Sequence, residues 1–308
     1  MPEAGSALRI GVDLGGTKTE IIALDATGAE LHRTRVPTPG HDYSAIVSSI
    51  CALVREVEQH LGAKASVGVG APGAISPATG RIKNSNTACL NGKPLDVDLG
   101  RMLGREVRVA NDANCFALSE AVDGAGRGHD VVFGAILGTG VGGGVVVAGR
   151  VLHGRHGITG EWGHNPLPWP TDDERPGPRC YCDKHACIET FLSGPGLSRD
   201  YEHACGERLT AVEIARRVAL GEPHAHAALE RYVDRLTRAL ASVINVLDPD
   251  VIVLGGGLSK IDLLYRELPR RLSAHVFSDV VTTEVARASH GDSSGVRGAA
   301  WLWPSAPR

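Results

Sequence analysis

The sequence predicts an α/β protein with two lobes of similar design. A strand, a glycine-rich turn and a second strand occur at residues 8–28, and the same order returns at residues 131–149. Elsewhere, segments with apolar residues at helical spacing alternate with short buried strands, which is typical of α/β proteins. A chain of 308 residues, 43% of them hydrophobic, can bury two such units. The repeat therefore indicates a duplicated lobe, with both glycine turns facing one shared cleft.

Composition argues against several classes of partner. The formal net charge of −3 gives no reason to expect nucleic acid or an anionic membrane as a partner. No run of about 20 apolar residues is present, and the N-terminus does not have the pattern of a signal peptide. Four of the seven cysteines are scattered and are expected to be buried thiols, namely Cys51, Cys89, Cys115 and Cys205. We therefore expect a cytoplasmic protein.

The first glycine turn follows a buried strand at residues 8–14 and precedes a second strand at residues 19–25. Its sequence is Gly15-Gly16-Thr17-Lys18, which differs from a P-loop because threonine precedes lysine and because a strand follows where a P-loop needs a helix. The amides of a glycine turn can still face phosphate oxygens. An ordinary hairpin turn is the alternative, but Asp13 beside the turn favours the phosphate interpretation.

The stretch up to residue 122 is predicted to alternate helices and strands. Apolar residues at helical spacing predict a helix that is capped by Asp42 or Ser44 and stopped by Gly62. The later segments are strands at residues 66–70 and 107–110 and a helix at residues 115–122.

Asn111 and Asp112 lie where the strand at residues 107–110 ends and the next helix begins. Open α/β sheets bind ligands at the carboxyl ends of their strands, so Asp112 could contact a ligand there. Either residue could equally be only the N-cap of the helix, since Asn and Asp are both preferred at that position. The residues alone leave these two interpretations open.

The second glycine turn is predicted as a loop at residues 138–144, between strands at residues 131–137 and 145–148. Gly138, Gly140 and Gly143 match the G-x-G-x-x-G pattern of dinucleotide-binding folds. That pattern requires a helix next, whereas a strand follows here, and we therefore reject a nicotinamide enzyme.

Residues 159–189 contain the densest group of reactive side chains. Cys180, Cys182 and Cys187 lie within eight residues, and His164 lies sixteen residues before the first of them. Three thiolates and one imidazole match a closed tetrahedral zinc site, which has no open position for chemistry. A disulfide with spare thiols is the alternative, but C-x-C spacing hinders pairing and nothing else indicates secretion. We therefore expect a structural zinc ion.

Two carboxylates, Glu161 and Glu189, bracket this cluster. A zinc ion that holds the loop rigid would allow these carboxylates to face a substrate. We therefore expect Glu161, His164 and Glu189 to form one wall of a polar pocket.

The last third of the chain is predicted to be mostly helical. Thr210 and Glu213 form a capping box, and a long amphipathic helix at residues 229–247 is stopped by Asp248-Pro249. A buried strand at residues 251–254 ends in Gly255-Gly256-Gly257, a third place where backbone can approach a ligand closely. A further helix follows, and small residues near the end indicate a helix suited to tight packing.

Five motifs together resemble the ROK family of sugar kinases, whose superfamily includes actin. They are Asp13-Leu14-Gly15-Gly16-Thr17-Lys18, Asn111-Asp112-Ala113-Asn114, Gly138-Thr139-Gly140-Val141-Gly142, Gly160-Glu161-Trp162-Gly163-His164 and the cysteine cluster. The resemblance covers residues 8–303. Residues 160–169, 180–194 and 290–303 look most like bacterial fructokinases of the manno(fructo)kinase type. The N-acetylglucosamine kinases are close behind, although they typically carry Phe where Trp162 stands.

The resemblance implies a role for each motif. Asp112 would be the general base, and Asn111, Glu161, His164 and Glu189 would hold sugar hydroxyls. His164 could also bind zinc through its other ring nitrogen. The first two glycine turns would hold ATP phosphates, with Asp13 near Mg²⁺, and the third would pass close to the nucleoside. The turn residues are Gly15, Gly16, Thr17, Lys18, Gly138, Thr139, Gly140, Gly142, Gly143, Gly255, Gly256 and Gly257.

The fold implied is a two-lobed, ribonuclease H-like duplication of the actin and sugar kinase type, with a zinc-stabilised loop. Residues 8–122 would form the small lobe and residues 123–290 the large lobe. Residues 291–308 would form a C-terminal helix that packs back towards the small lobe. Relatives of this kind are commonly homodimers, and we expect the same here.

The function implied is ATP-dependent phosphorylation of a hexose to its 6-phosphate. Fructose is the first expectation, with mannose also accepted, and N-acetylglucosamine and glucose are alternatives within the family. A sugar-responsive regulator is the non-enzymatic alternative. It would carry a helix-turn-helix before residue 8, where only seven residues stand, and it would have no need of Asp112.

Overall fold

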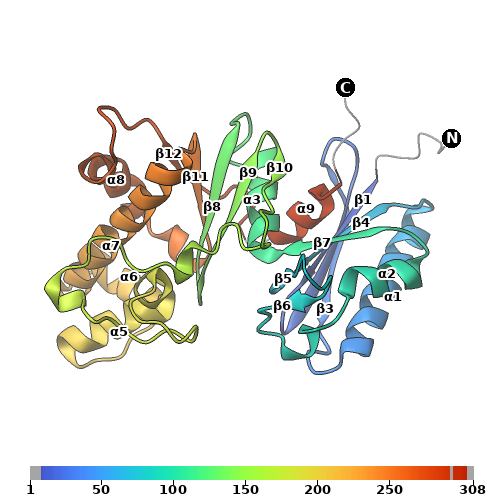
Figure 1. Cartoon of the computed structure of the whole chain (residues 1–308), viewed down its shortest axis with the longest axis horizontal. Coiled ribbons are helices and arrows are strands. Elements are labelled where there is room, and N and C mark those ends of the chain that lie inside the picture. Colours follow the sequence, from blue (N-terminus) through green and yellow to red (C-terminus); the bar gives the residue numbers. More distant parts are fainter. Residues whose placement is uncertain (1–7, 292–293, 304–308) are drawn as a thin grey trace.

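The first lobe is built on a five-stranded sheet. A computed structural model describes residues 8–291 and 294–303. The sheet order is β3-β2-β1-β4-β7, in which the first three strands along the chain form an antiparallel meander and β4 and β7 run parallel to β1 (Figure 1). The strands are β1 (Arg9–Leu14), β2 (Lys18–Leu24), β3 (Glu30–Pro37), β4 (Ser66–Ala71) and β7 (Val107–Asn111).

The second lobe repeats this sheet. Its order is β10-β9-β8-β11-β12, again with an antiparallel meander followed by two strands parallel to the first. The strands are β8 (Val131–Leu137), β9 (Val141–Val147), β10 (Arg150–Val151), β11 (Val251–Gly255) and β12 (Glu284–Arg287). The identical order confirms the predicted α/β duplication.

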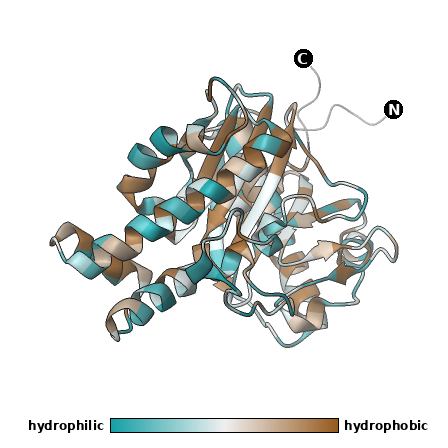
Figure 2. Cartoon of the chain, turned by 60° about the vertical axis from the view of Figure 1, so that its left-hand side comes forward, coloured by the Kyte–Doolittle hydropathy of each residue, from teal (hydrophilic) through white to brown (hydrophobic). Residues whose placement is uncertain are grey.

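Helices surround both sheets. In the first lobe these are α1 (Tyr43–Leu61) and α2 (Leu95–Leu103). In the second they are α4 (Ile188–Leu192), α5 (Gly194–Cys205), α6 (Ala211–Ala219), α7 (Pro223–Leu247) and α8 (Asp262–Arg271). Of these, α1, α6, α7 and α8 were predicted from the sequence, whereas α2, α4 and α5 were not. Figure 2 shows mostly hydrophobic strands inside helices that are partly polar. None of the helices in the described parts of the chain has the length and hydrophobicity needed to cross a membrane.

Several predicted helix ends are confirmed. The Asp42 carboxylate accepts hydrogen bonds from the amides of Ser44 at 2.8 Å and Ala45 at 3.1 Å, and Gly62 ends α1 with a positive φ of 65°. The Thr210 hydroxyl likewise accepts from the Glu213 amide at the start of α6. The long helix α7 begins six residues earlier than predicted, at Pro223.

One predicted loop is wrong. Residues 142–144 lie inside β9, whose glycines pair with β8. Close packing explains why a glycine run is extended here. A Cβ atom on Gly144 would lie 2.7 Å from the carbonyl oxygen of Ala113, and one on Gly143 would lie 2.9 Å from that of Gly160. Side chains at these positions would push the neighbouring elements away.

Two helices, α3 (Asp112–Asp123) and α9 (Ser294–Trp301), lie between the sheets (Figure 1). Helix α3 contacts β8 and β9, while α9 packs on β1 and β4 and against α3. Glycine makes this packing possible, because a Cβ atom on Gly298 would lie 1.6 Å from the carbonyl oxygen of Cys115. The predicted lobe limits at residues 122 and 290 stay predictions, and residues 292, 293 and 304–308 of the predicted C-terminal segment lie outside the described residues.

Candidate active site

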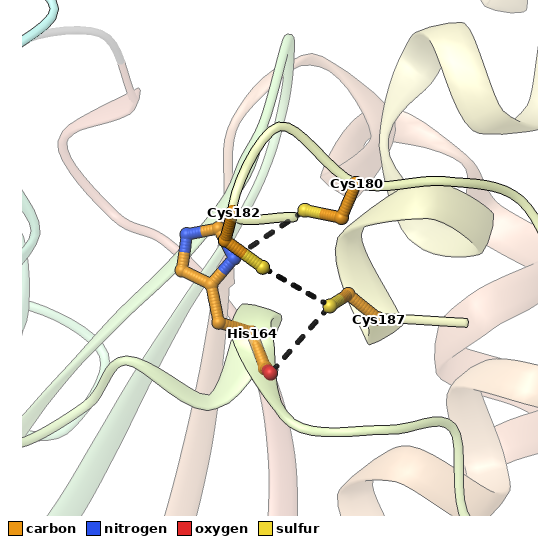
Figure 3. Close-up of side chains that lie close together, drawn as sticks. All are labelled: His164, Cys180, Cys182 and Cys187. Carbon is orange, nitrogen blue, oxygen red and sulfur yellow. Dashed lines mark hydrogen bonds between the residues drawn. The ribbon is translucent and has the colours of Figure 1, made fainter. Parts of the chain in front are cut away.

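The predicted zinc ligands are brought together by the structure. The ligand atoms of His164, Cys180, Cys182 and Cys187 all lie within 4.8 Å of one another (Figure 3). The sulfurs of Cys182 and Cys187 are 3.5 Å apart, and Nδ1 of His164 is 3.6 Å from the sulfur of Cys180. Tetrahedral zinc, with bonds of about 2.3 Å to sulfur and about 2.0 Å to nitrogen, separates its ligands by roughly 3.5–3.8 Å. The four side chains therefore fit a closed zinc site.

A disulfide does not compete with this arrangement. All seven cysteines are free thiols. The sulfur separation of 3.5 Å between Cys182 and Cys187 is well beyond the bond length of about 2.05 Å in a disulfide.

Tyr181 is a neighbour of this cluster that sequence reasoning missed. Its hydroxyl lies 2.8 Å from Nε2 of His164, the ring nitrogen that faces away from the thiols, and the two rings meet edge to face. The Tyr181 side chain is otherwise largely exposed to solvent. A sugar hydroxyl that used His164 would therefore share Nε2 with this phenol. The position between two cysteine ligands is the signal that could have identified Tyr181.

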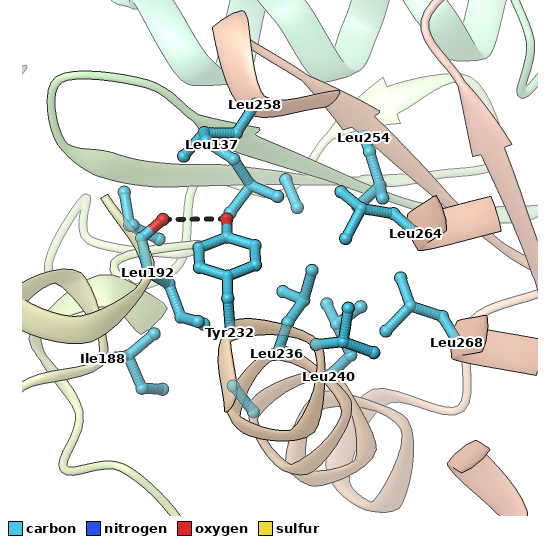
Figure 4. Close-up of a cluster of buried hydrophobic side chains, with 14 of the residues drawn as sticks. Leu137, Ile188, Leu192, Tyr232, Leu236, Leu240, Leu254, Leu258, Leu264 and Leu268 are labelled. Carbon is cyan, nitrogen blue, oxygen red and sulfur yellow. Dashed lines mark hydrogen bonds between the residues drawn. The ribbon is translucent and has the colours of Figure 1, made fainter. Parts of the chain in front are cut away.

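Glu189 connects the cysteine loop to the second glycine turn. It lies in the first turn of α4, which is anchored by Ile188 and Leu192 in the core beside α7, where the Tyr232 hydroxyl donates to the Leu192 carbonyl (Figure 4). Oε2 of Glu189 accepts the Val141 amide at 2.9 Å. A Cβ atom on Gly140 would lie 2.6 Å from the same oxygen, so any larger residue there would displace the Glu189 carboxylate.

Trp162 does not contribute a wall to this region. Its indole is buried, meets Phe133 edge to face and donates its N–H to the Gly142 carbonyl at 2.8 Å. The residue that distinguishes the two kinase branches in sequence thus packs inside the second lobe.

Asn111 and Asp112 have separate local roles. Asn111 is the N-cap of α3, because its side-chain oxygen accepts the Ala113 amide, while its side-chain nitrogen donates to the Gly73 carbonyl at 3.0 Å. Asp112 is the first residue of the helix and is exposed, and its Oδ1 accepts the same Ala113 amide at 2.8 Å. Desolvation by the surrounding protein raises the pKa of the Asp112 carboxyl, and hydrogen bonds from Ala113 and Asn111 act in the opposite direction. Asp112 is therefore available for a role other than capping.

Carboxylates from both lobes influence one another here. Burial raises the pKa of Asp13 to about 7, and the negative charges of Asp112 and Glu20 contribute to that rise. Burial also raises the pKa of Glu161, as do the charges of Asp112 and Glu189, whereas His164 and Lys83 lower it. Grouped carboxylates that repel one another are a suitable place for a divalent cation. Asp13 therefore fits the predicted position near Mg²⁺.

The glycine turns line two cavities. Gly16 and Thr17 border one of about 810 Å³, together with Thr38, His41, Asn86 and Thr87. Another, of about 850 Å³, is large enough for a nucleotide. Gly138, Thr139 and Gly257 line it, with residues of α5, α6 and the 3₁₀ turn at Gly257–Lys260. The second and third turns touch, because a Cβ atom on Gly256 would lie 2.5 Å from the Leu137 carbonyl oxygen.

A sequence model of the ROK family matches residues 9–306. The chain belongs to the ROK family. It is 43% identical over 296 residues to the N-acetyl-D-glucosamine kinase of Yersinia enterocolitica, a match that covers 95% of this chain and 98% of that protein.

Solved structures of the ROK family share this fold. A ROK hexokinase from Thermus thermophilus superposes with a TM-score of 0.85 at 30% identity, over 96% of this chain and 97% of that one. A ROK family glucokinase from Streptomyces griseus, in complex with glucose and AMPPNP, gives a TM-score of 0.75 at 29% identity, over 96% and 98%. These matches confirm the predicted family and its two-lobed fold.

In this ROK protein, the structure separates the predicted site residues into two groups. The charges of Asp112 and Glu189 raise the pKa of Glu161, and the charge of Asp112 raises the pKa of Asp13, so these four carboxylates form one group. Gly142 and Gly143 instead lie in β9, where close packing already accounts for glycine. Sequence reasoning missed the cavity residues from α5 and α6, such as Ser198 and Ala211, because no sequence pattern marks their side chains as ligand contacts.

Proposed function

We propose that this chain is an ATP-dependent hexose kinase. The observation that carries the proposal is the second glycine turn. Gly138 and Thr139 line the nucleotide-sized cavity, and two residues later the Val141 amide binds Glu189. One turn thus joins a nucleotide cavity to a carboxylate that can hold sugar hydroxyls. The named sugar kinases among its relatives support the same activity.

The proposed reaction uses the chain's residues for binding and for one proton transfer. Glu161 and Glu189 hold the sugar through hydroxyl groups. Asp112 accepts the proton of the attacking sugar hydroxyl. The oxygen of that hydroxyl bonds to the γ-phosphorus of ATP, and the bond from this phosphorus to the bridging oxygen breaks and releases ADP. Mg²⁺, when bound beside Asp13, would neutralise phosphate charge. Amides of the first two glycine turns would contact the phosphates.

We propose N-acetyl-D-glucosamine as the preferred acceptor, with transfer to a terminal hydroxyl. Support comes from the relatives at 43% identity, which are kinases of that sugar and match 95% of this chain. Fructose is the second candidate, because residues 160–169 and 180–194, which flank the carboxylates, resemble manno(fructo)kinases. Trp162 is buried, so the resemblance at that residue says nothing direct about contacts with the sugar.

A coupled ADP-release assay tests both proposals. Fructose, mannose, glucose and N-acetyl-D-glucosamine are compared by kcat/KM with the purified chain and MgATP. We expect the highest value for N-acetyl-D-glucosamine. A clearly higher value for fructose would change the proposed acceptor and leave the proposed kinase activity standing, whereas no ADP release with any of the four sugars would reject the kinase activity. We also propose a homodimer, which light scattering of the same sample checks.

A further inference from the structure

A short hairpin of the first lobe contacts segments next to two residues of the proposed site. It consists of β5 (Ala74–Ile75) and β6 (Ile82–Lys83), paired antiparallel. At its start, the Gly73 carbonyl accepts the side-chain nitrogen of Asn111, the residue before Asp112. A Cβ atom on Gly73 would lie 2.4 Å from the Lys83 carbonyl oxygen, so the two ends of the hairpin are in close contact. The hairpin is thereby tied to the strand end that presents Asp112.

The same hairpin reaches the second lobe. The Lys83 ammonium donates to the His156 carbonyl at 2.7 Å. The next residue, Gly157, lies against the backbone of β5. A Cβ atom on Gly157 would be 3.1 Å from the Ile75 carbonyl oxygen. His156 and Gly157 belong to the segment that runs from β10 to Glu161. One hairpin therefore contacts the approaches to both Asp112 and Glu161.

We propose that Lys83 is a positioning residue for sugar phosphorylation. It fixes the segment before Glu161 to the hairpin that is tied to Asn111, and so sets where the sugar lies relative to Asp112. This proposal depends on the proposed hexose kinase activity. A misplacement of about 1 Å in such an arrangement is enough to lower turnover strongly.

Replacement of Lys83 by methionine tests this role. Lys83→Met keeps an unbranched apolar stem and removes the charge and the donor. We expect KM for the hexose to rise about tenfold, the effect of losing one charge-assisted hydrogen bond, while KM for ATP stays near wild type. Isothermal titration with the hexose should show the same loss of affinity. Lys83→Arg retains a charged donor and should restore most of the affinity.

Arg81→Met is the matched control. Arg81 lies two residues earlier in the same hairpin segment, and its guanidinium donates to the Gly92 carbonyl within the first lobe. We expect hexose KM near wild type in this variant. If Lys83→Met matches Arg81→Met in hexose affinity, or raises the KM values of hexose and ATP equally, Lys83 has no positioning role. A wild-type protein that phosphorylates no hexose rejects the proposed function itself, and the positioning role with it.

Discussion

At the scale of single residues, the site depends on carboxylates held in unlike surroundings. Asp13 lies at the end of β1 and Asp112 at the start of α3, and each negative charge disfavours ionisation of the other. Paired titratable groups of this kind are characteristic of catalytic sites. The sequence predicted both residues from their places beside a glycine turn and at a strand end. It could not show that Asn111 rather than Asp112 occupies the N-cap position, because Asn and Asp are equally suited to it.

Asp112→Asn tests the general base. The substitution preserves shape but removes the ability to accept the hydroxyl proton. A positioned base contributes on the order of 10²–10⁴-fold in rate, so kcat should fall by at least about 10²-fold. The melting temperature should change little, because Asn111 caps the helix. Asp42→Asn, at the N-cap of α1, is the control and should keep wild-type kcat. Wild-type kcat in Asp112→Asn would contradict the assignment.

Asp13→Asn tests how much the ionisation of Asp13, which is buried near Asp112 and Glu20, lowers the free energy of unfolding. The folded-state pKa of about 7 lies above the ordinary value of 3.8. Asp13 therefore stabilises the fold below about pH 4, and that contribution is lost as the pH rises through 7. Without Mg²⁺ at pH 8, Asp13→Asn should raise the free energy of unfolding by roughly 1–4 kcal/mol, and it should lose activity. Urea unfolding at pH 5 and pH 8 measures this, and equal stability of both proteins at pH 8 would refute it.

At the scale of elements, hydrophobic periodicity predicted the helices and strands whose conformation does not depend on contacts with distant parts of the chain. Helix α1 and strands β1, β4, β7 and β11 follow from apolar spacing. Strand β3 was not predicted. It is an edge strand that pairs only with β2, and its exposed, polar residues do not show the pattern of a buried strand. The glycines of β9 were predicted as a loop because glycine is uncommon in strands. Their strand conformation depends on α3 and the backbone at Gly160, which are distant in sequence.

Cys182→Ser tests the metal loop. We expect one zinc per wild-type chain and almost none in the variant, because a closed structural site needs all four ligands. Sugar affinity should fall as well, since Glu189 is two residues from Cys187. Cys205→Ser, a thiol outside the cluster in the second lobe, should keep the metal. Elemental analysis decides, and an active wild-type protein without zinc would contradict the metal site.

Glu174→Gln tests how the proline-rich loop at residues 166–178 is anchored to α7. Burial alone would raise the pKa of Glu174, but hydrogen bonds from Arg238 and Arg235 lower it to about 2. Its stabilising contribution is therefore present above about pH 4.5 and is lost as the pH falls towards 2. Both arginines are buried, so the variant should lose about 3–5 kcal/mol in urea unfolding at pH 7. The exposed pair of Asp172 and Arg175 is the comparison, and Asp172→Asn should cost less than about 1 kcal/mol.

At the scale of the whole molecule, α3 and α9 determine how the lobes meet. Helix α3 begins at Asp112, and the start of α9 lies beside Asp13, because a Cβ atom on Gly295 would be 3.1 Å from Oδ2 of Asp13. The helices therefore link the two carboxylates through their own packing. A change in the spacing of the helices should alter the site as well as the stability of the fold.

Gly298→Ala tests this link. The added methyl carbon would lie 1.6 Å from the Cys115 carbonyl oxygen and 2.4 Å from its carbonyl carbon, so backbone rather than a flexible side chain must move. Overpacking of this kind typically costs about 1–3 kcal/mol and sometimes more. We expect a loss at or above the upper end and a melting temperature lower by roughly 5–10 °C. Because α3 must shift, kcat should fall while KM for ATP changes less.

Gly100→Ala is the matched control for that substitution. Gly100 is also a glycine inside a helix, α2, but its added methyl carbon would lie 3.1 Å from the Arg105 carbonyl oxygen, which a shift of a few tenths of an ångström relieves. Alanine is the better helix former by about 1 kcal/mol, so this variant should melt near or above wild type with unchanged kcat. If Gly298→Ala matched it in both measurements, α3 and α9 would not be in the close contact that sets the spacing of Asp13 and Asp112. A lower melting temperature with unchanged kcat would show that the contact between α3 and α9 stabilises the fold but does not set the geometry of the site.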